Sequence, residues 1–344
     1  EATANEGYTF ENWTEDDEIV STNATYAFEV VEDRDLVANF VINEYEITAS
    51  VNPTNAGTIE GAGVYNYGEE ATLEATANEG YTFENWTEDD DIVSTNAIYT
   101  FEVVVERDLV ANFSINEYEI TASVVPENAG TIEGAGVYNY GEAATLEATA
   151  NEGYTFENWT EDGEEVSTEM VYTFEVVEDR ELVANFSING YEIIASVNPE
   201  NAGTITGAGV YNYGETATLG VTENVGYDFV NWTEDGEVVS TDMVYAFVVV
   251  SDRELVANFS INGYEITASV NPEDAGTVTG AGVYNYGETA TLAATANEGY
   301  SFENWTEYGE EVSTNAIYTF EVVSDRELTA NFAINQYEIT ASAA

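Results

Sequence analysis

The sequence GYTFENWT at residues 153–160 returns along the chain with small changes at a fixed interval of 73 residues. Its aromatic residues alternate with polar ones, which predicts a strand with one buried face. The interval is read most easily from the five tryptophans, Trp13, Trp86, Trp159, Trp232 and Trp305. The one arginine of each copy keeps the same interval, at Arg34, Arg107, Arg180, Arg253 and Arg326. The chain is therefore a tandem repeat.

Residues 117–189 give one full copy, and its apolar residues alternate with polar ones as half-buried strands require. We expect strands over residues 118–124, 131–133, 137–141, 144–150, 153–160, 171–176 and 182–186. Turns are expected over residues 126–130, where proline fixes φ and glycine permits a positive φ, and at Asp162-Gly163, a hairpin pair. Residues 178–181 are expected to form a charged turn. No helical periodicity appears, so each copy should be all-β with about six or seven short strands.

The boundaries follow from the interval. We expect a partial repeat over residues 1–43, full repeats over 44–116, 117–189, 190–262 and 263–335, and the first strand of a further repeat over 336–344. Only four residues, 114–117, lie between Phe113 and Tyr118, and none is proline or glycine. The alternation changes phase there, which predicts a one-residue kink between adjacent repeats and a rod with restricted bending.

The composition excludes several classes of function. The 344 residues include 67 Asp and Glu but 5 Lys and Arg, for a formal net charge of −62, so phosphate backbones and anionic membrane surfaces should repel the chain. No stretch is apolar and long enough to insert into a membrane. Because there is no His, Cys or Lys, we expect no disulfide and no enzyme. Self-repulsion at this charge predicts a protein that requires salt.

The repeat resembles the divergent internalin-type B-repeat family of bacterial and archaeal surface proteins. The resemblance rests on Gly153-Tyr154-x-Phe156-x-x-Trp159 followed by Leu182-x-Ala184-x-Phe186, with Pro126, Gly130 and Tyr172-x-Phe174 at matching places. It implies an extracellular, non-enzymatic module in a tandem array of small β-grasp-like or sandwich-like domains. The absence of lysine and the extreme acidity depart from the usual members.

The triplet Asn-Trp-Thr is a consensus for N-glycosylation. It places candidate acceptors at Asn12, Asn85, Asn158, Asn231 and Asn304, although a packing role of the asparagine in a strand is the plainer interpretation. Weaker candidates are Asn23 in Asn-Ala-Thr and Asn112, Asn185 and Asn258 in Asn-Phe-Ser.

The acidic turn at residues 88–91 invites a calcium interpretation, since calcium prefers several oxygen ligands. Tyr308 stands where Asp89 would be a ligand, which favours a solvated hairpin turn, no cofactor and diffuse screening by cations. The arginine of each copy is expected to pair with adjacent carboxylates, as Arg180 could with Glu178, Asp179 or Glu181.

We expect a structural function: a rod, stalk or fibre outside the cell, which could assemble into filaments. The alternative is an adhesin or a glycan- or protein-binding array, in which exposed tyrosines such as Tyr138 and Tyr140 form an aromatic platform. The expected partners are neighbouring repeats and other copies of the chain, with a cell-surface glycan or protein as the alternative. Near-identical repetition favours the structural interpretation because repetition supplies length.

Overall fold

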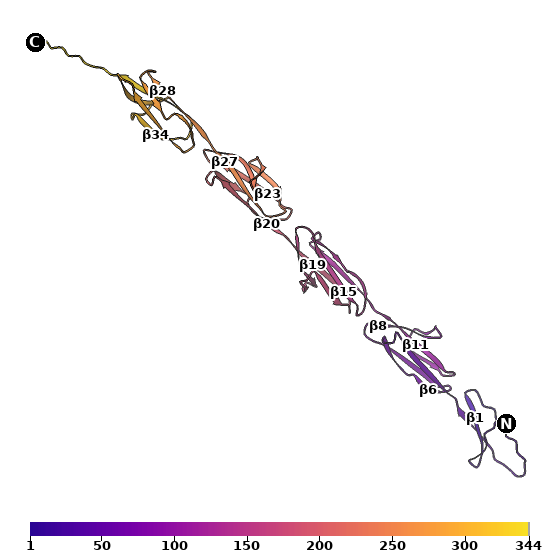
Figure 1. Cartoon of the computed structure of the whole chain (residues 1–344). Helices are drawn as coiled ribbons and strands as arrows, with labels where there is room; N and C mark the ends of the chain where they lie inside the picture. The colour runs from indigo at the N-terminus through magenta and orange to yellow at the C-terminus, as the bar shows by residue number, and fades with distance from the viewer. Residues whose placement is uncertain (343–344) are drawn as a thin grey trace. The chain divides into compact units, whose positions relative to one another are not determined.

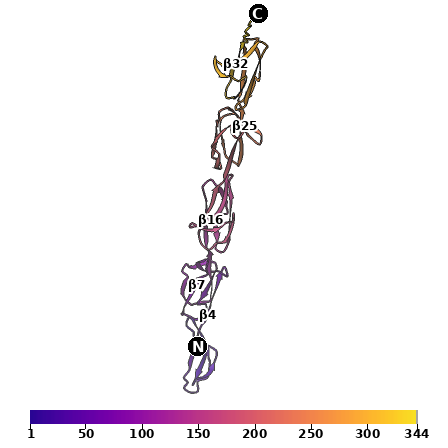
Figure 2. The same ribbon diagram turned by 90° about the vertical axis from the view of Figure 1, so that its left-hand side faces the viewer.

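The computed structural model describes residues 1–342, and all of its regular elements are strands. By contacts, the chain divides into two compact units. The first comprises Glu1–Asn151 and Phe156–Ser187, and the second comprises Glu152–Thr155 and the residues from Ile188 onward. In Figures 1 and 2, each full repeat is a two-layered set of strands.

Repeat 44–116 has eight strands in two sheets. The strands are β4 (Glu44–Asn52), β5 (Gly57–Glu60), β6 (Gly63–Asn66), β7 (Glu70–Ala77), β8 (Tyr81–Glu88), β9 (Asp91–Ser94), β10 (Ile98–Glu102) and β11 (Arg107–Ile115). One sheet has five strands in the order β6-β4-β11-β8-β9, and the other has three in the order β10-β7-β5. Strands β4 and β11 are parallel, whereas the other pairs are antiparallel.

The other full repeats have the same two sheets. Repeat 117–189 contains β12 (Glu117–Val125), β13 (Gly130–Glu133), β14 (Gly136–Asn139), β15 (Ala143–Ala150), β16 (Tyr154–Glu161), β17 (Glu164–Ser167), β18 (Val171–Glu175) and β19 (Arg180–Ile188). Repeat 190–262 contains β20 (Gly190–Asn198), β21 (Gly203–Thr206), β22 (Gly209–Asn212), β23 (Thr216–Glu223), β24 (Tyr227–Glu234), β25 (Glu237–Ser240), β26 (Val244–Val248) and β27 (Arg253–Ile261). Repeat 263–335 contains β28 (Gly263–Asn271), β29 (Gly276–Thr279), β30 (Gly282–Asn285), β31 (Thr289–Ala296), β32 (Tyr300–Glu307), β33 (Glu310–Ser313), β34 (Ile317–Glu321) and β35 (Arg326–Ile334). The segment 1–43 has one sheet of β1 (Tyr8–Glu15), β2 (Glu18–Ser21) and β3 (Val37–Ile42).

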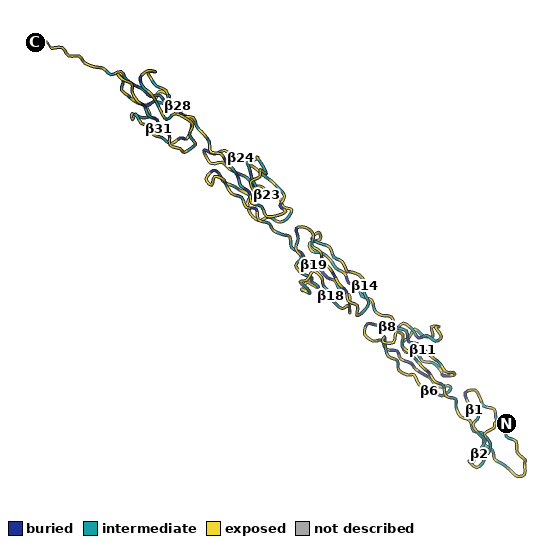
Figure 3. Tube along the Cα trace, viewed as in Figure 1, coloured by how far each residue is buried: buried dark blue, intermediate teal, exposed yellow. Residues whose placement is uncertain are grey.

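The core of each repeat lies between its two sheets. In repeat 44–116, Trp86 and Leu109 of the larger sheet and Leu73 of the smaller sheet are fully buried in one cluster. Strand β7 shows the origin of this arrangement, because its buried residues alternate strictly with exposed ones. Figure 3 shows the same alternation of buried and exposed positions along the trace. Each repeat is thus a sandwich, the second of the two folds that the family resemblance implies.

The predicted strands are confirmed, with two corrections. The repeat has eight strands rather than six or seven, because residues 164–167 after the Asp162-Gly163 hairpin form the short strand β17. Residues 180 and 181 do not belong to a turn. They begin β19, where Arg180 pairs with Ile120 in the parallel ladder.

The hairpin and the kink are confirmed. Asp162 and Gly163 have φ angles of 50° and 83°, as a type I′ turn requires. Strand β11 ends at Ile115 and β12 begins at Glu117, so Asn116 alone separates them. Residues 335–342 form no strand. In the full repeats this segment pairs with a strand about 60 residues further along the chain, so the strand proposed for 336–344 stays a prediction; its last two residues lie outside the described range.

Candidate functional site: the joint between repeats

The joint at Asn116 ties two repeats together through the backbone of a single residue. The amide of Asn116 donates to the carbonyl oxygen of Gly80 at 2.8 Å, and its own carbonyl accepts from the amide of Tyr140 at 2.8 Å. The hydroxyl of Thr82 also donates to Oδ1 of Asn116 at 2.7 Å. Gly80 and Thr82 belong to repeat 44–116 and Tyr140 to repeat 117–189, so one residue is bonded to both.

The ring of Tyr140 lies against Gly80, and this contact explains the glycine of the aromatic motif. Gly80 has φ +79°, and a Cβ atom placed on it would lie 2.0 Å from Cδ1 of Tyr140. A side chain there would be strained by the backbone and would also clash with the ring. The glycine of the motif therefore has two roles: it adopts the positive φ of the turn, and its lack of a side chain leaves room for the Tyr140 ring of the next repeat.

The same contact recurs within both units. A Cβ atom on Gly7, Gly153 or Gly226 would lie 2.0 to 2.2 Å from the ring of Tyr67, Tyr213 or Tyr286 respectively. The backbone bonds recur as well, as in Asn262, whose amide donates to Gly226 and whose carbonyl accepts from Tyr286. These joints are built from equivalent residues.

One polar contact distinguishes the joints. Burial and the neighbouring Glu79 carboxylate raise the pKa of Tyr140, because both disfavour the charged phenolate. Glu6 and Glu152 act in the same way on Tyr67 and Tyr213. Val225 occupies the corresponding place beside Tyr286, so that joint lacks the carboxylate.

The arginine of each repeat holds the two sheets together. Arg107 donates from Nη2 to Glu88 at 2.6 Å and from Nη1 to the hydroxyl of Tyr99 at 3.1 Å, and its guanidinium carbon lies 4.4 Å from the centre of the Phe101 ring. Glu88 belongs to the larger sheet, whereas Tyr99 and Phe101 belong to the smaller one.

The expected pairing of arginine with adjacent carboxylates was wrong. In repeat 117–189 the partner of Arg180 is Glu161, 19 residues earlier and on the neighbouring strand β16. This ion pair lowers the pKa of Glu161 below its ordinary value. A partner this distant in sequence could have been recognised only with the strand order in hand.

The glycosylation candidates lie on the outer face of the larger sheet. Asn85 is half-buried, and its Oδ1 accepts a hydrogen bond of 3.0 Å from the side-chain nitrogen Nδ2 of Asn112. The same nitrogen donates to the hydroxyl of Thr87, and Asn52 donates to Oδ1 of Asn112, so the asparagines form a row across three strands. The other candidates accept the same hydrogen bond, from the asparagine 27 residues later in the chain: Asn12, Asn158, Asn231 and Asn304. This is the packing role weighed above; glycosylation of these residues stays a prediction.

The residues considered for calcium binding and for an aromatic platform also have structural roles. Asp89 and Asp90 form the tip of a hairpin, with φ angles of 50° and 69°. No three carboxylates within residues 1–342 are grouped so as to hold a metal ion. Tyr138 is half-buried and donates to the carbonyl of Gly134 at 2.5 Å, and Tyr140 is the joint residue, so these two rings are packed rather than presented as a platform.

Comparison with known proteins identifies the repeat. A family described as the divergent InlB B-repeat domain matches residues 1–44, 47–117, 120–190, 193–263 and 266–336. Two proteins of Evansella cellulosilytica are similar: a "Putative Gly-rich membrane protein", 27% identical over 90% of this chain and 36% of its own length, and a "Putative membrane protein", 26% identical over 78% and 40%. The chain thus spans about two fifths or less of these relatives.

Among solved structures, the Bacillus anthracis TIE protein is similar over 78% of this chain and 60% of its own, with 12% identity and a TM-score of 0.34. Two B repeat units of the Staphylococcus aureus collagen-binding protein match over 84% of this chain and 99% of theirs, with 8% identity and a TM-score of 0.12. Scores this low carry no argument about function. Within residues 1–342 there is no helix of the length and apolarity needed to cross a membrane.

Proposed function

Because the chain belongs to the divergent InlB B-repeat family, we propose that it is a non-enzymatic structural protein of the cell surface, whose repeats build a rod, stalk or fibre outside the cell. The names of the two relatives, both called membrane proteins, support a surface location.

The proposal rests on the joint between repeats. A mobile linker between domains usually contains several glycine, serine or proline residues, whereas Asn116 is one residue hydrogen-bonded to both of its repeats. Rotation about this joint would break two backbone hydrogen bonds and separate Tyr140 from Gly80. A chain joined in this way transmits position from one repeat to the next, as a spacer must.

The polar side chains support a structural rather than a catalytic role. In repeat 190–262, Glu234 forms an ion pair with Arg253, the one cationic side chain of that repeat. The shallow depression beside this pair is lined mainly by exposed carboxylates, including Glu192 and Asp252. The sequence offers no His, Cys or Lys to act as a base or nucleophile beside them.

The test is to excise one repeat in the native protein. Deleting residues 117–189 joins Asn116 directly to Gly190 and places Tyr213 opposite Gly80, so an equivalent joint is rebuilt. Gold labelling of an epitope on the repeat farther from the cell surface, viewed by electron microscopy, should show the label moving closer to the cell by roughly 30 Å, the size of a compact 73-residue domain.

The control deletes a length that is not a whole period, for example residues 117–152, which removes β12, β13, β14 and β15 and leaves the other strands of that sandwich without them. Its interrupted sandwich should give a collapsed or degraded product rather than a shorter one. Labels that stay at an unchanged distance after the 117–189 deletion would contradict the spacer. Loss of adhesion to other cells in proportion to the number of repeats, at unchanged distance, would support the adhesin instead.

A further inference from the structure

The outer face of the three-stranded sheet in repeat 190–262 carries no charge. Its outward-facing positions are Thr204 and Thr206 on β21, every second residue from Thr216 to Thr222 on β23, and every second residue from Val244 to Val248 on β26. These positions are five threonines, two valines, one alanine and one glycine, and we call them the neutral face. Val244 and Val248 are 62% and 57% exposed.

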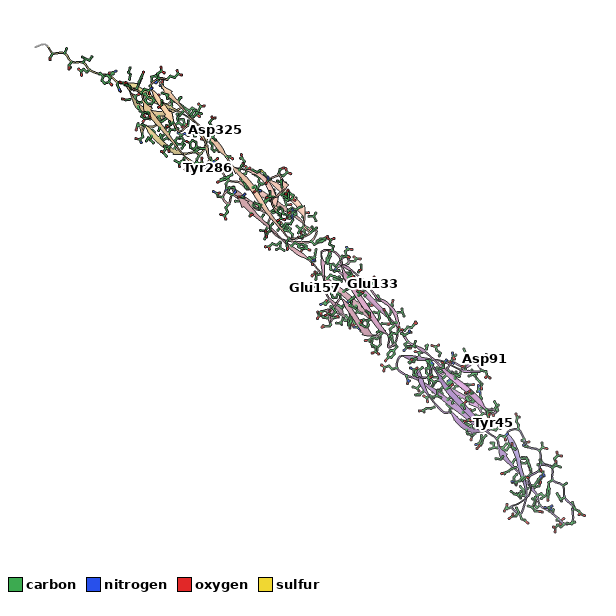
Figure 4. All side chains as sticks on the ribbon, in the orientation of Figure 1. Tyr45, Asp91, Glu133, Glu157, Tyr286 and Asp325 are labelled. Atoms are coloured by element: carbon green, nitrogen blue, oxygen red, sulfur yellow. The ribbon has the colours of Figure 1, made fainter. Side chains whose placement is uncertain are left out.

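The equivalent face of repeat 44–116 is strongly acidic. Glu60 lies directly opposite Glu74, and Glu70 directly opposite Glu102. Like charges in facing positions of a ladder destabilise it, so these glutamates are not there to stabilise the sheet. In repeat 117–189, Glu133 again faces Glu147, and Figure 4 shows Glu133 among the surface side chains.

In repeat 190–262 all four of these charges are absent from the same ladder positions. Thr206, Thr216, Gly220 and Val248 stand where repeat 44–116 has Glu60, Glu70, Glu74 and Glu102. Repeat 263–335 is nearly as neutral, with Glu321 as the one charged residue at its nine positions. Because the buried residues of the repeats hardly differ, the requirements of the fold do not explain this change.

We propose that the neutral face is a pairing surface for a second copy of this chain. Two chains of net charge −62 repel one another wherever their carboxylates approach. Two neutral faces can meet without desolvating a carboxylate, and the contact removes Val244 and Val248 of both chains from water. A contact between the same face of two copies is the usual geometry of a homodimer.

The size of the face sets the strength of pairing. Three strands about 4.8 Å apart and five residues of about 3.3 Å each give roughly 240 Å² per copy. A stable interface buries about 800 Å² on each side, so one pair of faces associates weakly. Acidic surroundings make the association dependent on salt, and several repeats of this kind in parallel would strengthen it by avidity. This inference rests on the proposed structural role and names the chain itself as the lateral partner.

The test uses the full chain with the substitutions Thr206→Glu and Thr216→Glu together. These restore on the neutral face the glutamates that repeat 44–116 carries at the same positions, so the fold tolerates them. The charge-matched control is Val230→Glu with Val238→Glu. Both of these valines are exposed in the larger sheet, at positions where repeat 117–189 has Glu157 and Glu165.

The readout is sedimentation equilibrium and small-angle scattering against protein concentration, in dilute buffer and in about 2 M NaCl. At high salt we expect the apparent mass of the unmodified chain to rise with concentration. Thr206→Glu/Thr216→Glu should abolish the rise, and Val230→Glu/Val238→Glu should keep it. The reverse substitution, Glu60→Thr with Glu70→Thr and Glu74→Gly, should increase it.

A constant mass of the unmodified chain at every concentration and salt would overturn the pairing, as would equal losses in both glutamate variants. Retention of the chain on a neutral polysaccharide matrix, lost in Thr206→Glu/Thr216→Glu without any self-association, would assign the face to a glycan instead. None of these substitutions alters the joint between repeats, so a negative result here would leave the proposed spacer role unaffected. If deletion of residues 117–189 left the label distance unchanged while the apparent mass still rose with concentration, the spacer role would be contradicted and the pairing of neutral faces would stand.

Discussion

Repeats 44–116 and 190–262 have nearly the same interior and different exteriors. Their ten buried core positions differ at one place, where Ala75 is replaced by Val221. On the outer face of the smaller sheet, by contrast, four glutamates are replaced by threonine, glycine and valine. At the joint, Val225 replaces Glu79. The fold therefore depends on the buried residues and the joint glycine, and the outer carboxylates vary independently of it.

The largest expected effect concerns the shared interior. Trp86→Ala and Trp232→Ala should each destabilise their repeat by about 3–5 kcal/mol, because each removes a fully buried indole. The loss should be about 1 kcal/mol smaller for Trp232, since the Trp86 nitrogen donates to the carbonyl of Ala97 at 3.2 Å and the Trp232 nitrogen is buried without a partner among the described residues. Native-state hydrogen exchange, which reads stability repeat by repeat, measures both. If the two substitutions lowered the stability of their repeats by amounts that differ by several kcal/mol, the two interiors would not be energetically equivalent.

The ion pair gives the next effect, and it depends on pH. Arg253 lowers the pKa of Glu234, so the pair stabilises repeat 190–262 above the pKa of a free carboxylate, about 4.3, and this contribution is lost as pH falls through the lower folded value. Since the side chains are 17% and 26% exposed, Glu234→Gln should cost about 1–2 kcal/mol at pH 7 and little near pH 2. Hydrogen exchange or chemical denaturation at a series of pH values tests this.

Glu200→Gln, at an exposed glutamate in a turn of the same repeat, is the control for the change of net charge. A penalty for Glu234→Gln that is the same at both pH values, or equal to that of Glu200→Gln, would show that the ion pair contributes nothing specific.

A smaller effect on stability is expected at the hairpin tips of the same two repeats. Asp90 of repeat 44–116 has φ 69°, whereas Gly236 occupies the same place in repeat 190–262 with φ 83°. Asp90→Gly should stabilise its repeat by about 1 kcal/mol, because glycine adopts a positive φ without steric cost. Gly236→Asp should destabilise by a similar amount. Thermal unfolding of the two variants measures the difference, and a destabilising Asp90→Gly would mean that the aspartate has a role the turn does not explain.

The smallest effect concerns the facing glutamates. Glu60→Thr with Glu74→Ala, which gives the residues of repeat 263–335 at these positions, removes one pair of like charges and should stabilise repeat 44–116 by a few tenths of a kcal/mol in dilute buffer. The gain should vanish in about 1 M salt, where charges are screened beyond about 3 Å. Hydrogen exchange at the two ionic strengths is the measurement, and an unchanged gain at high salt would exclude an electrostatic origin.

Much of this fold could be predicted from the alternation of residues. The turn at Asp162-Gly163 and the kink at Asn116 follow from local rules of φ and strand period, and the structure contains both. The partner of Arg180 could not be predicted, because it depends on which strands lie side by side. The role of Gly80 was missed for the same reason: a glycine before an aromatic strand indicates a turn, and its contact with Tyr140 comes from another repeat.

The most direct test of the central claim is a distance measurement across the joint. The chain has no native cysteine, so spin labels at Ile98→Cys and Val171→Cys, exposed and equivalent positions in adjacent repeats, report on that joint alone. Pulsed electron resonance should give one narrow distance distribution, and adding Gly80→Ala or Tyr140→Ala should broaden it while circular dichroism stays unchanged. A distribution that is already broad in the unmodified joint would contradict the account, because Asn116 would then be an ordinary flexible linker.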